Sequence, residues 1–397
     1  MSKKQKMSHT LIRTLVACAV LTTGMVLYGT AVREPSPVQL IRVPAGGIQP
    51  QAVTDAKGVV HVVYFSGNPS AGDLYYVRST DAGRTFSKPI RVNSEPGSAV
   101  AVGNIRGARV ALGRNDIVHV AWNGSGRATP NAGNNRPPML YTRLNEAGTA
   151  FEPQRNLIHS AWGIDGGGSV AADRAGHVYV LWHAPIPGKN GEANRRVWIA
   201  TSNDDGKTFA PERIAWDTPT GACGCCGLDA FADRKGTLFV LFRSAEQVVH
   251  RDMNLLVSRD HGDTFRGSDI SKWNIGACVM SSESFAESKA GVLGAWETEK
   301  QVYFGRMNPA TGALTETIGA PGTGNNRKYP SITGNSRGQI LLAWTENMGW
   351  KKGGTLNWQV FDDNGQPIGS TGHAQGVPAW SLVSAFTAPD GSFRVMY

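Results

Sequence analysis

Residues 169–182 read SVAADRAGHVYVLW, and the pattern in this stretch decides the fold. A short apolar run leads into a polar turn that ends in Gly176, and a run of β-branched and aromatic residues follows. Glycine permits a tight turn because it adopts positive φ without steric cost, and β-branched and aromatic residues favour strands. The stretch therefore predicts a hairpin of two antiparallel strands.

The same phrase recurs along the chain, at intervals of about 45 to 60 residues, which makes the protein a repeat architecture. The other copies span residues 50–65, 108–122, 229–242, 284–296, 331–344 and 385–397. A single hairpin cannot bury both of its faces, so the units must stack on one another. The segments between the units show no helical period of apolar residues.

Further strands are expected after each of the first six hairpins. The first copy is followed by residues 74–78 and 89–92, which have strand composition. Four antiparallel strands repeated at this period describe the blades of a β-propeller. The seventh unit stops after two strands, and residues 38–43 supply an outer strand that closes the ring. We therefore predict an all-β propeller of four-stranded blades. Seven units are counted, and six would follow if the last hairpin merges with a neighbour; a solenoid is the alternative.

The domain organisation follows from composition. The chain has 397 residues, of which 41% are hydrophobic and 18% charged, and these values exclude disorder, a coiled coil and a polytopic membrane protein. The first 14 residues carry four bases and no acid, and residues 15–32 are apolar. We interpret residues 1–33 as a signal peptide or an N-terminal membrane anchor, and residues 34–397 as one propeller domain. An extracytoplasmic protein is expected, whether secreted, periplasmic or anchored to a membrane and facing outward.

The charge of the chain argues against nucleic acid as a partner. Without the four bases of the first 14 residues, 36 bases face 31 acids, so about +5 of the net charge of +9 remains. These charges are dispersed, and an exported chain without a basic run is a poor match for nucleic acid. A glycan, a small carboxylate ligand and a protein partner all remain open.

A sharper signature, S-x-D-x-G-x-T-F, marks the hairpin between the third and fourth strands. It occurs at residues 79–86, 202–209 and 258–265. Its aspartates, Asp81, Asp204 and Asp260, can accept backbone N–H bonds within a turn, its glycine can take positive φ, and its phenylalanine can pack inward. These three stretches resemble the Asp-box, or bacterial neuraminidase repeat, of the sialidase superfamily.

The resemblance extends over about residues 38–397, because the blade phrase and the box together recur across that range. Residues 145–151 look like a decayed fourth box. The resemblance implies a sialidase-like propeller in which the aspartates of the boxes are structural and lie away from the active site.

The lengths of the connections separate two faces of the predicted propeller. The turns between first and second strands and the Asp-box turns are short, and they share one face. The links between second and third strands are long, and they share the other face with the segments that lead into each first strand. Binding is expected on long loops carried by a rigid scaffold. These lead-in segments span residues 46–50, 106–109, 162–168, 223–229, 278–284, 326–331 and 380–384.

The resemblance also implies a set of site residues. A sialidase holds a carboxylate with three arginines, and it uses a tyrosine nucleophile paired with glutamate together with an aspartic acid/base. The candidates for these catalytic roles are Tyr329 with Glu283 as its partner and Asp165 as the acid. The candidate ligand-binding residues are Arg106, Arg109, Arg327 and Trp380.

One element of the family pattern is missing. The first arginine of the family belongs to an Arg-Ile-Pro phrase, but the similar residues 42–44, Arg-Val-Pro, sit several residues early. The aligned residues 47–50 contain no arginine. This favours an exported propeller that binds a glycan or another carboxylate without classical sialidase catalysis. The alternative is an exo-acting glycoside hydrolase resembling exo-α-sialidase.

The four cysteines after Cys18 are Cys223, Cys225, Cys226 and Cys278, and they fall in adjacent lead-in segments. Two disulfides suit an oxidising compartment and an even count. Because neighbouring Cα atoms lie about 3.8 Å apart, Cys225 and Cys226 should not pair with each other. A disulfide between Cys278 and one of them, and another between Cys223 and the other, fits disulfide geometry better. A four-thiolate Zn²⁺ or Cu(I) site is the second interpretation, and a reactive redox centre is the third.

Overall fold

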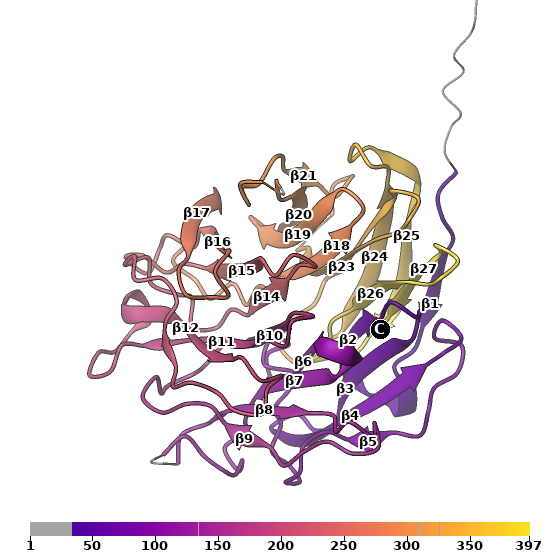
Figure 1. Ribbon diagram of the computed structural model, residues 1–397. Coiled ribbons are helices and arrows are strands. Elements are labelled where there is room, and N and C mark those ends of the chain that lie inside the picture. Colours follow the sequence, from indigo (N-terminus) through magenta and orange to yellow (C-terminus); the bar gives the residue numbers. More distant parts are fainter. Residues whose placement is uncertain (1–33, 134, 309, 325) are drawn as a thin grey trace, which may run out of the picture. The chain divides into compact units, whose positions relative to one another are not determined.

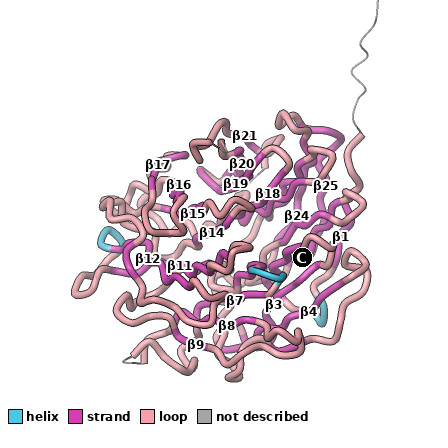
Figure 2. Tube along the Cα trace, in the orientation of Figure 1, coloured by secondary structure: helices cyan, strands magenta, loops and turns pink. Residues whose placement is uncertain are grey.

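The computed structural model describes residues 34–397 except 134, 309 and 325, and it arranges them in seven sheets around a common axis (Figure 1). Short 3-10 turns at Pro44–Gly46, Arg114–Asp116 and Glu192–Asn194 are the only helical elements in this range (Figure 2). No helix among these residues is long and apolar enough to cross a membrane. The expected leader, residues 1–33, lies outside the described residues.

Six of the sheets are four-stranded blades, numbered here in chain order from 1 to 6, and in each the first strand is innermost. Their strands are β2 (Ile48–Thr54), β3 (Val60–Asn68), β4 (Ala71–Ser79) and β5 (Ile90–Arg91); β6 (Arg109–Leu112), β7 (Val118–Asn123), β8 (Met139–Arg143) and β9 (Arg155–Asn156); β10 (Ser169–Ala172), β11 (Val178–Pro185), β12 (Arg195–Ser202) and β13 (Arg213–Ile214); β14 (Leu228–Ala232), β15 (Leu238–Arg243), β16 (Met253–Ser258) and β17 (Arg266–Ser271); β18 (Ser284–Ser288), β19 (Gly291–Thr298), β20 (Gln301–Arg306) and β21 (Ile318–Gly319); β22 (Lys328–Gly334), β23 (Ile340–Glu346), β24 (Gly354–Phe361) and β25 (Pro367–Val377).

The seventh blade closes the ring with a strand from the other end of the domain. It contains β26 (Ser384–Thr387), β27 (Phe393–Met396) and β1 (Val38–Ile41), and β1 runs parallel to β27. The prediction that the N-terminal segment closes the propeller is therefore confirmed, with seven blades and not six. This blade has three strands among the described residues, as expected from two strands in the last unit and one outer strand from the N-terminal segment.

Apolar packing between neighbouring blades holds the ring together. The recurring tryptophans at the ends of the second strands, Trp122, Trp182, Trp296 and Trp344, are completely buried. Trp122, for example, packs in one cluster with Phe65 and Leu74 of the preceding blade. The repeated phrase therefore encodes the contact between blades as well as the hairpin, since its last residue fills the space between two sheets.

The three S-x-D-x-G-x-T-F stretches fold into equivalent turns, called here the Asp turns. In the third, the Asp260 carboxylate accepts hydrogen bonds from the Thr264 amide at 2.9 Å and from the Ser258 hydroxyl at 2.7 Å. Asp81 and Asp204 accept the corresponding bonds in their own turns. The Asp205 amide donates to the Gly176 carbonyl at 2.8 Å, which places the Asp turns on the same face as the turns between first and second strands, as expected.

Candidate functional site

A set of four polar side chains, which we call the collar, ties each of blades 2 to 5 to the following blade on the long-loop face. In four blades the second strand ends in an aromatic residue followed by a buried polar residue, and that residue contacts the lead-in segment of the next blade. Asn123 donates to the Gly166 carbonyl at 2.6 Å, and His183 donates to the Cys226 carbonyl at 2.9 Å. Arg243 donates to the Ser281 hydroxyl at 2.8 Å, and Glu297 accepts from Lys328 at 3.0 Å. The collar fixes the backbone that lines the axis.

His183 illustrates how the collar is held in one protonation state. The side chain is 2% exposed, and its burial together with the nearby Arg195 guanidinium lowers the pKa of His183 to about 4. The ring is therefore neutral near pH 7. Because Nε2 donates to the Cys226 carbonyl, Nδ1 is free to accept, and the Arg195 guanidinium lies 3.4 Å from it.

A cavity of about 230 Å³ opens among the lead-in segments and long links of the last three blades, with Asn104 from the segment that precedes the second blade. Four aromatic side chains line it: Trp273, Tyr329, Trp350 and Trp380. The rings of Trp350 and Trp380 meet edge to face with centroids 4.5 Å apart, and Trp350 is 61% exposed. We call this the aromatic cavity. Its walls offer flat apolar faces next to open solvent, an arrangement suited to a small ring-shaped ligand.

The charged groups of the aromatic cavity are two lysines and a glutamate. The Lys328 ammonium lies 3.0 Å from one oxygen of Glu297 and 3.3 Å from the other. Glu297 is completely buried, and this burial raises its pKa, although Lys328 and Arg243 oppose the shift. Lys300 is exposed on the cavity wall and makes no ion pair with any described residue. It is therefore the cation in this cavity that is best placed for a ligand.

Backbone strain is concentrated around the aromatic cavity. Six of its lining residues other than glycine have positive φ, between 48° and 65°. These residues are Asn104, Met280, Lys300, Asn326, Tyr329 and Trp380. Residues other than glycine rarely adopt a positive φ unless the surrounding structure enforces it. Residues with such a strained backbone cluster at ligand sites.

The three candidate catalytic residues lie in different surroundings. Tyr329 lines the aromatic cavity, and burial, together with the charge of Glu297, raises its pKa. Glu283 lies elsewhere, beside Ser281 and close to the charges of Arg243 and Arg109. Glu297, and not the expected partner Glu283, lines the cavity together with Tyr329. Asp165 forms an ion pair with Arg106 at 2.6 Å on the surface of the long-loop face.

The three candidate arginines do not share a target, because each has its own carboxylate. Arg106 pairs with Asp165, and Arg109 lies 4.0 Å from Asp229 inside the ring. Arg327 is 4% exposed and pairs with Glu346 at 3.0 Å. Four of the five N–H donors of Arg327 are used by Glu346, Gln301, Ala320 and Pro321. The expected ligand arginine is therefore engaged in packing between blades.

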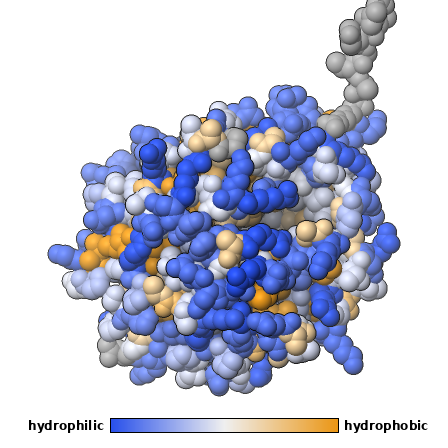
Figure 3. All heavy atoms as spheres, viewed as in Figure 1, coloured by the Kyte–Doolittle hydropathy of each residue, from blue (hydrophilic) through white to orange (hydrophobic). Residues whose placement is uncertain are grey.

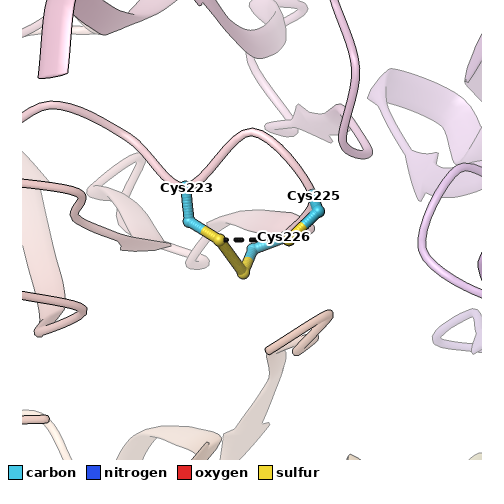
Figure 4. Close-up of side chains that lie close together, drawn as sticks. All are labelled: Cys223, Cys225 and Cys226. Carbon is cyan, nitrogen blue, oxygen red and sulfur yellow. Dashed lines mark hydrogen bonds between the residues drawn. A yellow bond between two sulfur atoms is a disulfide. The ribbon is translucent and has the colours of Figure 1, made fainter. Parts of the chain in front are cut away.

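The four cysteines form two disulfides, Cys223–Cys226 and Cys225–Cys278. The prediction of two disulfides, with Cys278 joined to one of the adjacent cysteines, is confirmed. Figure 4 shows the short loop that carries three of them. While both disulfides are intact, none of the four sulfurs is a thiolate, so the alternative Zn²⁺ or Cu(I) site has no ligands here. Cys278 also lines the aromatic cavity.

A second group of possible metal ligands lies on the opposite face. Asp173, His177 and His261 offer ligand atoms within 4.8 Å of one another. The Asp173 carboxylate lies 2.7 Å from His177 and 3.8 Å from His261, and the two imidazole rings stack with centroids 4.0 Å apart. In blade 1, His61 makes a comparable contact with Asp55 at 3.4 Å, so a carboxylate-bonded histidine is also a recurring packing feature.

A wide central channel opens on the face that carries the Asp turns. Its volume is about 820 Å³, and the ends of the inner strands line it. Most of the lining side chains are small or apolar, including Ala111, Ala172 and Phe285. The space-filling view in Figure 3 shows a largely hydrophilic surface with scattered apolar patches. Its buried polar groups include Asp55 and Asp173, and each of these carboxylates already contacts a histidine, so the aromatic cavity is the stronger candidate site.

Four lining residues were not predicted from the sequence: Glu297, Lys300, Lys328 and Trp350. A signal for Glu297 was present, because an aromatic residue followed by a polar one occurs near the end of six of the second strands, as in Trp296 and Glu297. The second strands end at the same face as the lead-in segments, so this pair also points to the long-loop face. Trp350 carries no comparable signal, because it lies in an irregular link.

No family model matches the chain, and no curated protein matches it in sequence. Its structure is similar to that of a protein of unknown function from Dyadobacter fermentans, with a TM-score of 0.51 and 13% identity over 79% of this chain and 94% of that one. It is also similar to a Hadza microbial sialidase, with a TM-score of 0.51 and 16% identity over 82% of this chain and 71% of that one. At these identities the likeness concerns the fold alone. The described part of this chain is a seven-bladed β-propeller with a sialidase-like fold.

Proposed function

We propose that this chain is an exported propeller that binds a small glycan, or another ligand bearing a carboxylate, in the aromatic cavity. The observation that carries the proposal is the combination of four aromatic walls with the exposed Lys300. Aromatic faces pack against the apolar side of a sugar ring, and an ammonium group attracts a carboxylate. A volume of about 230 Å³ fits one ring and its substituents rather than a long oligosaccharide.

Binding without classical sialidase hydrolysis is the form of the proposal that the geometry favours. A carboxylate clamp needs guanidinium groups that converge on one ligand, whereas Arg106, Arg109 and Arg327 each face a separate carboxylate. A tyrosine nucleophile needs a hydroxyl that loses its proton readily, whereas the pKa of Tyr329 is raised by burial. Export is supported by the two disulfides, which persist in oxidising compartments.

The test is titration of the isolated protein with N-acetylneuraminic acid, glucuronic acid and neutral galactose, followed by tryptophan fluorescence. We expect saturable quenching by the acidic sugars and a weaker response to galactose. Trp350→Ala should weaken binding by about tenfold, or 1.4 kcal/mol, because it removes one wall of the cavity. Lys300→Met should reduce the preference for acidic sugars. Trp358→Phe, on strand β24, is the matched control, and a lack of saturable binding to all three sugars would reject the proposal.

The second candidate function is an exo-acting glycosidase, favoured by one observation: Tyr329 and Glu297 face the same cavity. Tyrosine paired with glutamate is the nucleophile arrangement of sialidases. The test is hydrolysis of a fluorogenic sialoside by the wild-type protein and by Tyr329→Phe. Turnover that disappears in the variant would establish hydrolysis in place of simple binding, whereas absence of turnover in both supports the binding proposal.

A further inference from the structure

The two disulfides differ in their access to solvent. Cys278 is exposed and Cys225 is half-buried, so the bond between them lies at the surface, beside the aromatic cavity. Cys223 is completely buried, and Cys226 is 1% exposed. Thiol–disulfide exchange requires a thiolate to reach a sulfur atom. A reductant in solution therefore reaches the outer disulfide, Cys225–Cys278, but not the inner one, Cys223–Cys226.

The inner disulfide is nevertheless in contact with the outer one. The Sγ atoms of Cys223 and Cys225 lie 3.6 Å apart, and the dashed line in Figure 4 joins them. These two atoms belong to different disulfides. Opening of the outer disulfide therefore leaves the Cys225 sulfur next to a sulfur of the inner disulfide. Attack by Cys225 on that sulfur is then an intramolecular step, which needs no diffusional encounter with a reductant.

The loop from Cys223 to Cys226 is held by contacts that do not depend on the disulfides. The Gly224 amide donates to the Glu192 carboxylate, which also pairs with Arg251 at 2.7 Å. The Cys223 amide donates to the Arg243 carbonyl at 2.9 Å, and His183 holds the Cys226 carbonyl. The close packing continues at Gly224, where an added Cβ would lie 3.1 to 3.3 Å from Glu192, Arg195 and Asp165. The sulfurs should therefore stay close together after the outer disulfide opens.

We propose that these four cysteines form a thiol–disulfide exchange relay in which Cys225 transfers reduction from the surface to the buried disulfide. A dithiol reductant, either a small molecule or a protein, first reduces Cys225–Cys278 to two thiols and leaves as a disulfide. The Cys225 thiolate then attacks Sγ of Cys223, a Cys223–Cys225 bond forms, and the Cys226 thiolate departs and takes up a proton. A second dithiol reduces the new, more accessible bond. The protein thus accepts four electrons and four protons from two dithiols.

The test compares two variants that lack the same disulfide. Cys278→Ser leaves Cys225 as the free thiol, next to the inner disulfide, whereas Cys225→Ser leaves Cys278 as the free thiol. The folded variants are alkylated at pH 8, then reduced, labelled with a second reagent and analysed by tandem mass spectrometry. In Cys278→Ser we expect the first label to divide between Cys225 and Cys226, because exchange releases Cys226. In Cys225→Ser the first label should remain on Cys278 alone.

The rate of reduction gives a second measurement on the same pair. With dithiothreitol, the inner disulfide should be lost about tenfold faster or more in Cys278→Ser than in Cys225→Ser, because only the former has a neighbouring nucleophile. Near-ultraviolet circular dichroism confirms that both variants stay folded during the reaction. Equal rates in the two variants, or label on Cys225 alone in Cys278→Ser, would overturn the relay. So would stoichiometric Zn²⁺ or Cu(I) and four free thiols in the isolated wild-type protein.

Discussion

Glu283 is an ionisable residue buried inside the ring. It is 1% exposed, and one of its oxygens has no hydrogen-bond partner among the described residues. Burial raises the pKa of Glu283 to about 8, although Arg243 and Arg109 act in the opposite direction. The carboxyl is therefore mostly protonated in the folded protein at neutral pH, whereas it is ionised when the chain is unfolded.

This difference predicts a specific pH dependence. Between pH 4.5 and pH 8 the folded state holds a proton on Glu283 that the unfolded state has lost, so stability should fall as pH rises through this window. Glu283→Gln removes that contribution. The stability of the variant relative to wild type should therefore grow from pH 5 to pH 8, by at most about 4 kcal/mol at 1.36 kcal/mol per pKa unit. The measurement is urea unfolding at several pH values, with the exposed Glu316→Gln as the control. A difference that stays constant with pH would contradict the assignment.

The residues of the site were predictable to different degrees. Tyr329 and Trp380 were found because a lead-in segment must face the axis, and both line the cavity. Arg327 lies in a segment of the same kind, but its side chain turns away and stacks 5.3 Å from the Trp344 ring. Spacing fixes where a backbone segment lies, whereas the direction of a long side chain depends on which neighbour offers acceptors, and the sequence does not reveal this.

The Asp turn is the element with the clearest relation between sequence and structure. In the turn at residues 258–265, hydrogen bonds from the Thr264 hydroxyl and amide and from Ser258 lower the pKa of Asp260 to about 2. Serine and threonine donate hydrogen bonds to the aspartate, and the glycine adopts positive φ. Because each residue has one such role, the motif was recognisable from spacing alone. In the decayed copy, the Asn145 side chain accepts comparable bonds from the Thr149 amide at 3.0 Å and from the Thr149 hydroxyl at 3.4 Å.

Removal of the Asp260 carboxylate should weaken the fold without affecting ligand binding. Asp260→Ala leaves the Thr264 amide and two hydroxyls without their acceptor, which should cost about 1 kcal/mol in the free energy of unfolding. Because the folded pKa is depressed, the contribution of this carboxylate is present above pH 4 and is lost as pH falls towards 2. Urea unfolding measures the cost, and sugar titration measures binding. A change in sugar affinity would contradict the separation of the Asp turns from the long-loop face. The control is Asp363→Ala, at another exposed aspartate.

At the scale of the whole molecule, closure of the ring depends on strand β1. The Val43 amide donates to the Tyr397 carbonyl, and the Tyr397 amide donates to the Ile41 carbonyl. Alternate amides of a parallel strand face the same neighbour, so the Gln39 amide also faces β27, opposite Arg394. Gln39 itself is exposed, so its side chain contributes little to packing.

Two substitutions at Gln39 therefore distinguish the contribution of its backbone amide to ring closure from the contribution of its side chain to packing. Gln39→Pro removes an amide directed at β27 and should destabilise the domain by about 3 kcal/mol, whereas Gln39→Ala keeps the amide and should be nearly neutral. Thermal and urea unfolding measure both variants. Equal stability of the two would show that β1 does not hold the ring closed.

The number of blades was predictable because the hairpin phrase is repeated seven times, and each copy brings its own core residues. The parallel pairing of β1 was only partly predictable. Residues 38–43 were identified as the closing strand because the last unit has only two strands of its own. Their parallel direction relative to β27 depends on the path of the chain and cannot be inferred from composition. The aromatic cavity was the least predictable feature, because it combines segments that lie far apart in the sequence, from Asn104 to Trp380.

The parallel closure has a mechanical consequence. The N-terminal end of β1 and the C-terminal end of β27 lie at opposite ends of the same sheet. A force that pulls these two ends apart therefore acts along the strands and strains all of their mutual hydrogen bonds at once, in shear. An antiparallel hairpin pulled at its open end would instead separate one bond at a time. The seventh blade is thus arranged to resist traction on the domain.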